Sequence, residues 1–266
     1  MPETHTMDIS DSLLQAFLSE ERYWPAVPQS LAELGLNEAL IESLVCKQLA
    51  VTGSASGRAI AEFVCIPFRL LEPVFAGLRT RHILVHSGSA PFNDYYYTLT
   101  DSGHEKTRSF QRACSYVGPA PVSLADYCIS VEAQCISTES PTDIDLKNAC
   151  ADITCDETLF NRIGPAVNSG AGMFLYGAPG NGKSTLARRI TGCFGEEIWI
   201  PRTLVEDGQL IKLFDSSAHE EASTERGGVL KGQEYDQRWV KIRRPTVCVG
   251  GELVMENLDI RHDPVS

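Results

Sequence analysis

The segment FLYGAPGNGKST, residues 174–185, decides the expected fold of this chain. It begins with an apolar run, continues through a glycine-rich turn and ends in a lysine followed by two hydroxyl residues. Residues 177–184 match the pattern G-x-x-x-x-G-K-[ST], in which a turn between a strand and a helix holds phosphate groups. The preceding run GMFLYG has strand length, and the following STLARRITGCFG has helix-forming residues. The sequence therefore predicts a strand, a phosphate-binding turn and a helix.

Each position of the turn has an expected physical role. The glycines let the backbone bend and approach the phosphates, and the amides of residues 180–183 can point at phosphate oxygens beside the positive end of a helix dipole. We expect Lys183 to contact the β- and γ-phosphates as the catalytic cation and Ser184 to bind Mg²⁺. Thr185 is expected either at the α-phosphate or in simple helix packing. The predicted site for ATP and Mg²⁺ comprises Gly177, Ala178, Pro179, Gly180, Asn181, Gly182, Lys183, Ser184 and Thr185.

Composition limits the class of protein. The 266 residues carry a net charge of −12, so any contact with nucleic acid needs a local basic face. The start, MPETHTMDIS, lacks the basic and apolar stretches of a secretory signal. No apolar run approaches the roughly 18 residues that a membrane-spanning helix needs. We therefore expect a cytoplasmic protein that does not contact membranes.

The nine cysteines are scattered along the chain and form no CxxC pair. Structural zinc sites normally use paired, closely spaced ligands. We therefore expect reduced and mostly buried thiols, and no zinc site.

The spacing of apolar residues in the range 37–117 predicts a small helical module with a hairpin. Apolar spacing predicts helices in the first part of this range, and a third helix is expected through FRLLEPVFAGLRTR, residues 68–81. Pro73 indicates either a kink in that helix or a start near Glu72. The run HILVHSGSAPFNDYYYTLT predicts two strands and a loop, and Thr100 is a plausible cap for a last helix.

Three helices, a strand, a loop, a strand and a helix follow one another in the order of a winged helix-turn-helix domain. YTLTDSGHEKTR, residues 97–108, resembles the segment after the wing in many bacterial winged-helix domains. Such a domain suggests DNA binding through the third helix and the wing. The range 37–117 contains eight basic and seven acidic residues, a net charge of +1, and thus offers few phosphate contacts. DNA binding is therefore possible but not favoured over protein contact or domain docking.

The remaining boundaries follow from proline and polar stretches. Residues 1–36 are interpreted as an N-terminal arm, and residues 118–150 as a linker that can hold one helix. Residues 151–266 contain the phosphate-loop motif and are interpreted as the N-terminal part of an ATPase domain. The expected fold class is thus an incomplete α/β P-loop NTPase core, a parallel sheet with flanking helices, preceded by a winged helix-turn-helix domain.

The whole chain resembles a bacterial group of AAA+ ATPases that carry an N-terminal winged helix. The resemblance runs through PQSLAELGL, CIPFRLLEPVFAGLR, YVGPAPVSLADY, IGPAVNSG, FLYGAPGNGKS, DGQLIKLFD and RRPTVCVGGEL. It implies ATP hydrolysis coupled to remodelling of a protein or nucleic-acid client, in a homo-oligomeric ring. It also implies that RIGPAVNSG, residues 162–170, helps to enclose the adenine, with Ile163 and Gly164 as the nearest residues. A helix end capped by Asn-Ser-Gly is the alternative for that segment.

Hydrolysis needs more than a phosphate cradle. An aspartate from a second strand must reach Mg²⁺, and an adjacent acid usually orients the attacking water. After Ser184 the candidates for these acids are Asp215, Glu252 and Asp259, each near an interrupted apolar run, and the alternative for each is a surface strand or loop acid. QRWVKIRRP supplies Arg238, Arg243 and Arg244, but their spacing marks none of them as an arginine finger.

We therefore expect a C-terminally truncated family member that binds ATP or ADP without hydrolysing ATP efficiently. The missing acids would lie beyond Ser266. The alternatives are a DNA-binding regulator that is gated by nucleotide and, less well supported, a small phosphoryl-transfer kinase.

Overall fold

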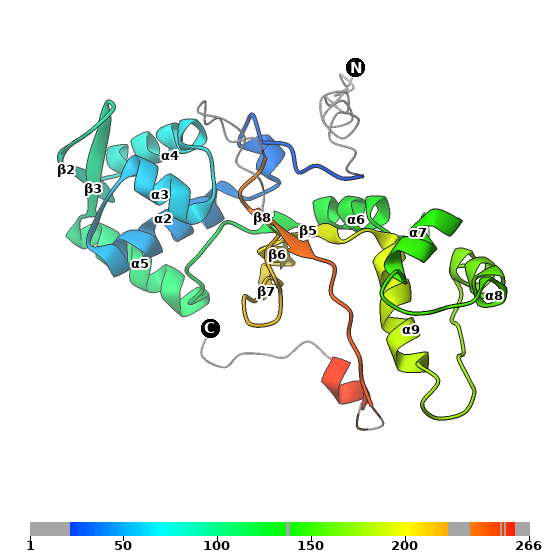
Figure 1. Cartoon of the computed structure of the whole chain (residues 1–266). Coiled ribbons are helices and arrows are strands. Elements are labelled where there is room, and N and C mark those ends of the chain that lie inside the picture. The colour runs from blue at the N-terminus through cyan, green and yellow to red at the C-terminus, as the bar shows by residue number, and fades with distance from the viewer. Residues whose placement is uncertain (1–21, 137–138, 223–234, 251, 253, 259–266) are drawn as a thin grey trace, which may run out of the picture.

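The chain forms helices and short strands. The computed structural model arranges them in two helical groups with small sheets between them (Figure 1). The structure describes residues 22–136, 139–222, 235–250, 252 and 254–258. Residues 38–113 form the first group and residues 143–194 the second. Within these described ranges, no helix combines the length and the apolar character needed to cross a membrane.

The first group contains four helices and a small sheet. Its elements are α2 (Glu38–Thr52), β1 (Ser54–Ser56), α3 (Gly57–Val64), α4 (Phe68–Thr80), β2 (Leu84–Ala90), β3 (Asp94–Leu99) and α5 (Asp101–Ala113). Strand β3 lies between β1 and β2 and is antiparallel to both. The helices and the hairpin follow the order that the sequence predicts, and β1 is an addition to it. That this group is a winged-helix domain stays a prediction.

Side-chain caps determine where three of these helices begin. Asn37, Ser56 and Thr100 each accept a hydrogen bond from a first-turn amide, ahead of α2, α3 and α5 respectively. The predicted cap at Thr100 is therefore confirmed. Helix α4 starts well before Pro73, so the alternative start near Glu72 is wrong.

The first group has its own apolar core. The ring of Phe75 on α4 stacks on the ring of Tyr97 on β3, with centroids 4.6 Å apart. Each large apolar side chain that is buried in such a core stabilises the fold by roughly 1.5–3 kcal/mol. The core around the two rings includes Leu44, Val45, Leu49, Ile60, Val64, Leu71, Val74, Leu78 and Leu84.

Lys47 on α2 is a charged residue that is fully buried in this core. Its Nζ donates a hydrogen bond of 3.1 Å to the carbonyl oxygen of Cys114, at the end of α5. Burial lowers the pKa of Lys47, because the charged form loses its hydration. Lys47 thus links α2 to the end of α5 at an electrostatic cost.

Residues 118–150 hold more structure than the linker that the sequence predicts. They contain β4 (Val122–Ser123), α6 (Leu124–Ala133) and α7 (Asp143–Ala149). The amide side chain of Gln134 donates to the carbonyl oxygen of Trp199 at 3.0 Å and accepts from its N–H at 2.6 Å. Thr142 and Asp145 form a capping box at the start of α7. The polar residues that suggested a linker are therefore engaged in caps and backbone hydrogen bonds.

Small sheets connect the two helical groups. Strand β5 (Glu197–Pro201) pairs with β8 (Trp239–Arg243) in antiparallel fashion, and β6 (Thr203–Glu206) forms a hairpin with β7 (Gln209–Lys212). Strand β4 pairs with β6 in parallel. No other parallel pair occurs among the described strands, so the parallel core sheet of the expected fold class stays a prediction.

The described part of the N-terminal arm packs against these sheets. The ring of Tyr23 lies 5.2 Å from the ring of Trp239, and the ring of Trp24 lies 5.6 Å from that of Trp199. The arm then forms a short 3-10 helix, η1 (Ala32–Leu34), whose Leu34 is fully buried. The arm is therefore part of the packed structure from residue 22 onward.

A buried ion pair joins the arm to β8. Arg238 and Asp236 are each 3% exposed, and Nη2 of the arginine lies 2.7 Å from Oδ2 of the aspartate. Nη1 of Arg238 also donates to the carbonyl oxygens of Leu34 at 3.0 Å and Pro121 at 3.1 Å. The N–H of Asp236 donates to the carbonyl oxygen of Pro25 at 2.8 Å. One pair thus connects the arm, the exit of the first group and β8.

The second group contains α7, α8 (Glu157–Asn168), α9 (Lys183–Ile190) and the 3-10 helix η3 (Thr191–Phe194). A further 3-10 helix, η4 (Met255–Leu258), follows near the end of the described chain. The second group has a separate core made of Leu146, Cys150, Ile163, Val167, Leu186, Ile190, Cys193 and Phe194. This core attaches α9 to α7 and α8.

We predict that Arg238→Ala lowers the free energy of unfolding by about 3–5 kcal/mol, because Asp236 is left charged, buried and unpaired. Urea denaturation followed by tryptophan fluorescence would report the change, since Trp199 and Trp239 belong to the neighbouring cluster. Arg243→Ala is the matched control, because Arg243 pairs with Glu220 at the surface and its loss should cost less than about 1 kcal/mol. Equal effects of the two variants would contradict the role assigned to Arg238.

A second prediction concerns pH. Because the pKa of Lys47 is lower in the folded protein than its ordinary 10.5, the unfolded chain binds more protons between the two values. Wild-type stability should therefore rise with pH across this interval relative to Lys47→Met, with a limiting slope of about 1.4 kcal/mol per pH unit.

Urea titrations from neutral pH to the ordinary lysine pKa would measure this difference. The buried thiol of Cys46, whose pKa is raised to about 12 mainly by burial, is present in both proteins and cancels in the comparison. A difference in stability that does not change with pH would show that Lys47 does not titrate as inferred.

Candidate functional site

The connection between α8 and α9 contains the glycine-rich turn. Gly177, Gly180 and Gly182 have φ angles of 147°, 85° and 69°, a range that favours glycine over every other residue. Gly182 is the N-cap of α9, and no side chain caps the helix there. The turn therefore has the backbone freedom that the sequence predicts, and its conformation needs glycine at these three positions.

Lys183 is the first residue of α9 and curls back over the turn. Its Nζ donates a hydrogen bond of 2.7 Å to the carbonyl oxygen of Ala178. Ser184 and Thr185 follow on the exposed first turn of the helix, where backbone amides have no partner within the helix. The structure thus brings Ala178, Lys183 and the helix N-terminus together.

The expected strand before the turn is absent, and that prediction is wrong. The apolar run 172–177 forms no strand, and Phe174 and Tyr176 are each 85% exposed. Their rings stack on each other with centroids 6.2 Å apart. A strand needs a neighbour for its backbone hydrogen bonds, and no strand of the described structure pairs with this run.

The segment RIGPAVNSG lies at the end of α8. Ile163 is 4% exposed and belongs to the core that attaches α9, so it serves packing. Gly164 is half-buried, and open space lies beside its Cα. The helix ends at Asn168, where Ser169 donates its hydroxyl to the carbonyl of Ala166 and Gly170 has a φ of 63°. The alternative of a helix end is therefore confirmed, and adenine contact at Gly164 stays a prediction.

The sequence offers Asp215, Glu252 and Asp259 as candidates for a metal-binding acid. The carboxylate of Asp215 accepts hydrogen bonds from the N–H and the hydroxyl of Ser217, and these bonds lower its pKa. The carboxylate of Glu252 accepts from the N–H of Gly250, and Asp259 lies outside the described residues. Within the described ranges, no carboxylate forms an ion pair or hydrogen bond with Lys183.

The three arginines considered for catalysis have other partners. Arg238 is buried in the ion pair with Asp236, and Arg243 pairs with Glu220. Arg244 pairs with Glu139. None of these contacts involves the glycine-rich turn.

The described residues contain no cluster of cysteines or other metal-binding side chains. No group of three or more His, Cys, Asp or Glu side chains there could hold a metal ion. All nine cysteines are free, but only Cys46, Cys150 and Cys193 are buried. The prediction of mostly buried thiols is therefore wrong.

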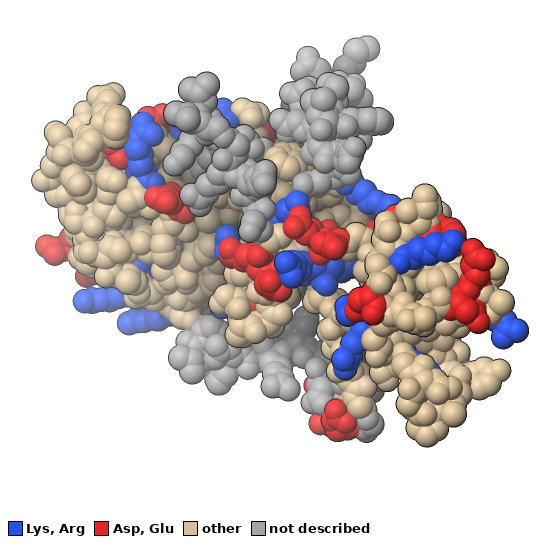
Figure 2. All heavy atoms as spheres, in the orientation of Figure 1, with Lys and Arg blue, Asp and Glu red and all other residues tan. Residues whose placement is uncertain are grey.

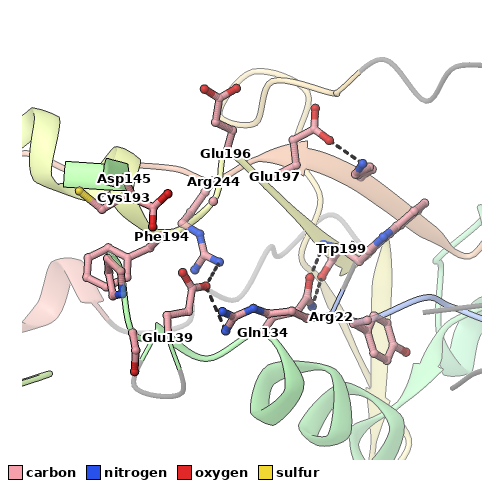
Figure 3. A pocket seen from close by; sticks show the side chains of 15 residues that line it. Arg22, Gln134, Glu139, Asp145, Cys193, Phe194, Glu196, Glu197, Trp199 and Arg244 are labelled. Atoms are coloured by element: carbon pink, nitrogen blue, oxygen red, sulfur yellow. Dashed lines mark hydrogen bonds and ion pairs between the residues drawn. The ribbon is translucent and has the colours of Figure 1, made fainter. Parts of the chain in front are cut away.

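Sequence reasoning missed a cavity of about 560 Å³ that Figure 3 shows. Its charged side chains come from four separate segments. They include Arg22 of the arm, Glu139 of the α6–α7 connection, Glu197 at the start of β5 and Arg244 just after β8. These residues are far apart in the sequence, so no local pattern could have indicated them.

We predict that Gly182→Ala destabilises the protein by about 1–2 kcal/mol, because alanine is strained at a φ of 69°. Gly77→Ala is the matched control inside α4, where the added methyl meets only a guanidinium nitrogen of Arg81 at 3.8 Å and should stabilise by about 0.5–1 kcal/mol. Chemical denaturation measures both changes. A neutral Gly182→Ala would show that the turn does not require the left-handed conformation.

Comparison with known proteins adds no assignment. A scan against models of protein families finds no match to this chain. A search of curated proteins finds no significant match either.

Proposed function

We propose that the turn at residues 177–182 and the first turn of α9 bind the phosphates of ATP or ADP together with Mg²⁺. The observation that carries this proposal is the position of Lys183, whose ammonium reaches across the turn to the carbonyl oxygen of Ala178 at 2.7 Å. The three glycines with positive φ support it, because they add no side chains of their own and open space surrounds each of their Cα atoms.

On phosphate binding, the ammonium group of Lys183 would leave the carbonyl oxygen of Ala178 and bind a phosphate oxygen, which is a stronger acceptor. The carbonyl of Ala178 is a neutral acceptor, whereas a phosphate oxygen forms a charge-assisted hydrogen bond of roughly twice the strength. The exposed hydroxyl of Ser184 is available to Mg²⁺, and the unpartnered amides of the first turn favour negative charge. The chemistry supplied by the bound metal would be charge neutralisation at the phosphates.

The packing of α9 supports the same function. Leu186 and Ile190 are buried in the apolar cluster that α9 shares with α7, α8 and η3, which holds the helix in place. On its outer side, Arg189 pairs with Asp152. A helix that is held along its length keeps its N-terminal amides pointed at one place, as a binding site requires.

We propose that this chain is an ATPase of the AAA+ type, a class that couples ATP hydrolysis to remodelling of a protein or nucleic-acid client in a homo-oligomeric ring. For hydrolysis, the described residues offer Lys183 but no carboxylate in contact with it. An arginine finger alone can be worth about 10³–10⁵ in rate. We therefore propose nucleotide binding with turnover near background for this chain alone.

For the first group, the charges favour protein contact over DNA binding. The hairpin region, residues 82–99, contains no lysine or arginine. Arg69 near the start of α4 donates to the carbonyl of Pro28 and to the side chain of Gln29, so it is engaged by the arm. Phosphate contacts dominate DNA affinity, and this surface provides few.

We predict that the wild-type protein binds Mg²⁺–ATP and that Lys183→Ala weakens binding by tenfold or more, because the contact with the β- and γ-phosphates is lost. Titration calorimetry with ATP, and separately with ADP, measures the change. Arg188→Ala is the matched control, since Arg188 is exposed on the same helix away from the turn.

Equal affinity of the wild-type and Lys183→Ala proteins would overturn the proposed site. Equal loss in Lys183→Ala and Arg188→Ala would show only a general effect of positive charge on this helix.

A further inference from the structure

The cavity in Figure 3 lies beside η3, at the opposite end of α9 from the phosphate-binding turn. Its volume of about 560 Å³ falls in the range of small-molecule sites. The arm, the α6–α7 connection, η3 with β5 and the end of β8 form its walls. The proposed nucleotide function makes no use of it.

Arg244 is the most under-satisfied group in this cavity. Its side chain is 16% exposed, and Nη2 lies 3.3 Å from Oε1 of Glu139. Nε is buried, and no group in the described structure accepts a hydrogen bond from it. Buried guanidinium N–H groups normally find acceptors. Burial accordingly lowers the pKa of Arg244, and Glu139 only partly offsets this effect.

Glu139 contacts Nη2 of Arg244 and leaves Nε without an acceptor. The same Oε1 atom that contacts Arg244 lies 3.5 Å from Nη1 of Arg22, as Figure 3 shows. The carboxylate is 8% exposed and sits between the two guanidinium groups. One oxygen at these distances serves both arginines, so Arg244 keeps donor capacity beside the cavity.

The other walls limit what kind of molecule fits. The rings of Tyr23, Phe194 and Trp199 also line the cavity, and because Phe194 and Trp199 are 8% and 3% exposed they present only their edges to it. The charged lining consists of Arg22, Lys241, Arg244, Glu139, Asp145, Glu196 and Glu197, so acids outnumber bases. A polyanion would meet this acidic excess, whereas a single anionic group can approach Arg244 alone. Lys241 and Glu197 pair with each other at 2.5 Å.

The geometry points to a binding site in this cavity for a small organic molecule that carries one oxyanionic group on an apolar or aromatic body. The oxyanion, a carboxylate or a phosphate monoester, pairs with the Nε and Nη edge of Arg244. Because Nε is enclosed, binding includes a turn of the guanidinium away from Glu139. The body of the ligand packs against Phe194 and Trp199.

The test uses 4-fluorobenzoate as the probe and 4-fluorobenzamide as its neutral counterpart of the same shape. Fluorine NMR titration should show that the wild-type protein binds the benzoate at least tenfold more tightly than the benzamide. Arg244→Gln should weaken benzoate binding by tenfold or more. Glu139→Gln should strengthen it, because the competing carboxylate is removed. Arg243→Gln, on the exposed neighbouring arginine, should leave it unchanged.

A parallel titration distinguishes the two sources of oxyanion. It uses 4-fluorophenyl phosphate and the Lys183→Ala protein, so that the phosphate-binding turn does not contribute. Binding of either probe that depends on Arg244 supports the site and identifies the preferred group. Equal binding of benzoate and benzamide, or benzoate binding that Arg244→Gln leaves unchanged, overturns it. If Arg244→Gln does not fold, the effect of Glu139→Gln decides, and unchanged or weaker binding there overturns the site.

Discussion

The buried pair of Arg238 and Asp236 is the interaction on which the arrangement of this chain depends. Taking two charges out of water costs several kcal/mol per ion unless the remaining donors find partners. Here Arg238 uses its remaining donors on the carbonyls of Leu34 and Pro121, while the N–H of Asp236 binds the carbonyl of Pro25. The pair is satisfied only when the arm, the exit of the first group and β8 are all in place.

That requirement extends beyond the pair itself. Fixing β8 fixes β5, because the two strands are paired from Glu197 to Pro201. Strand β5 directly follows η3 and α9, so the position of α9, the helix of the proposed nucleotide site, is tied to the sheets. Strand β8 ends next to Arg244, and the arm supplies Arg22, so the two arginines around Glu139 come from segments that the buried pair holds together. The cavity is thus a consequence of this packing.

Local features of the sequence predicted local features of the structure. The cap at Thr100, the helix through Pro73 and the hairpin at residues 84–99 depend on neighbouring residues, and all three are observed. The glycine turn is local in the same sense. Non-local features were missed: Gln134 binds the backbone of Trp199, and Glu139 meets Arg244, across intervals that no pattern spans. The apolar run 172–177 was predicted as a strand because its composition fits, but strand formation also requires a partner.

Nucleotide binding and hydrolysis differ in the same way, because binding depends on local features and hydrolysis on non-local ones. A phosphate cradle needs a flexible turn, one lysine and one helix N-terminus, all within residues 177–185, and helical packing alone can hold them. The described structure does this through the contacts of α9 with α7 and α8, without a strand before the turn. Hydrolysis needs a carboxylate and an arginine delivered from elsewhere in the fold, and such groups depend on sheet pairing or on another subunit. Arg243 of β8 and the flanking Arg238 and Arg244 pair instead with Glu220, Asp236 and Glu139 respectively. The proposed site therefore contains only the local half of what an ATPase needs, and the non-local half has no counterpart among the contacts of the described residues.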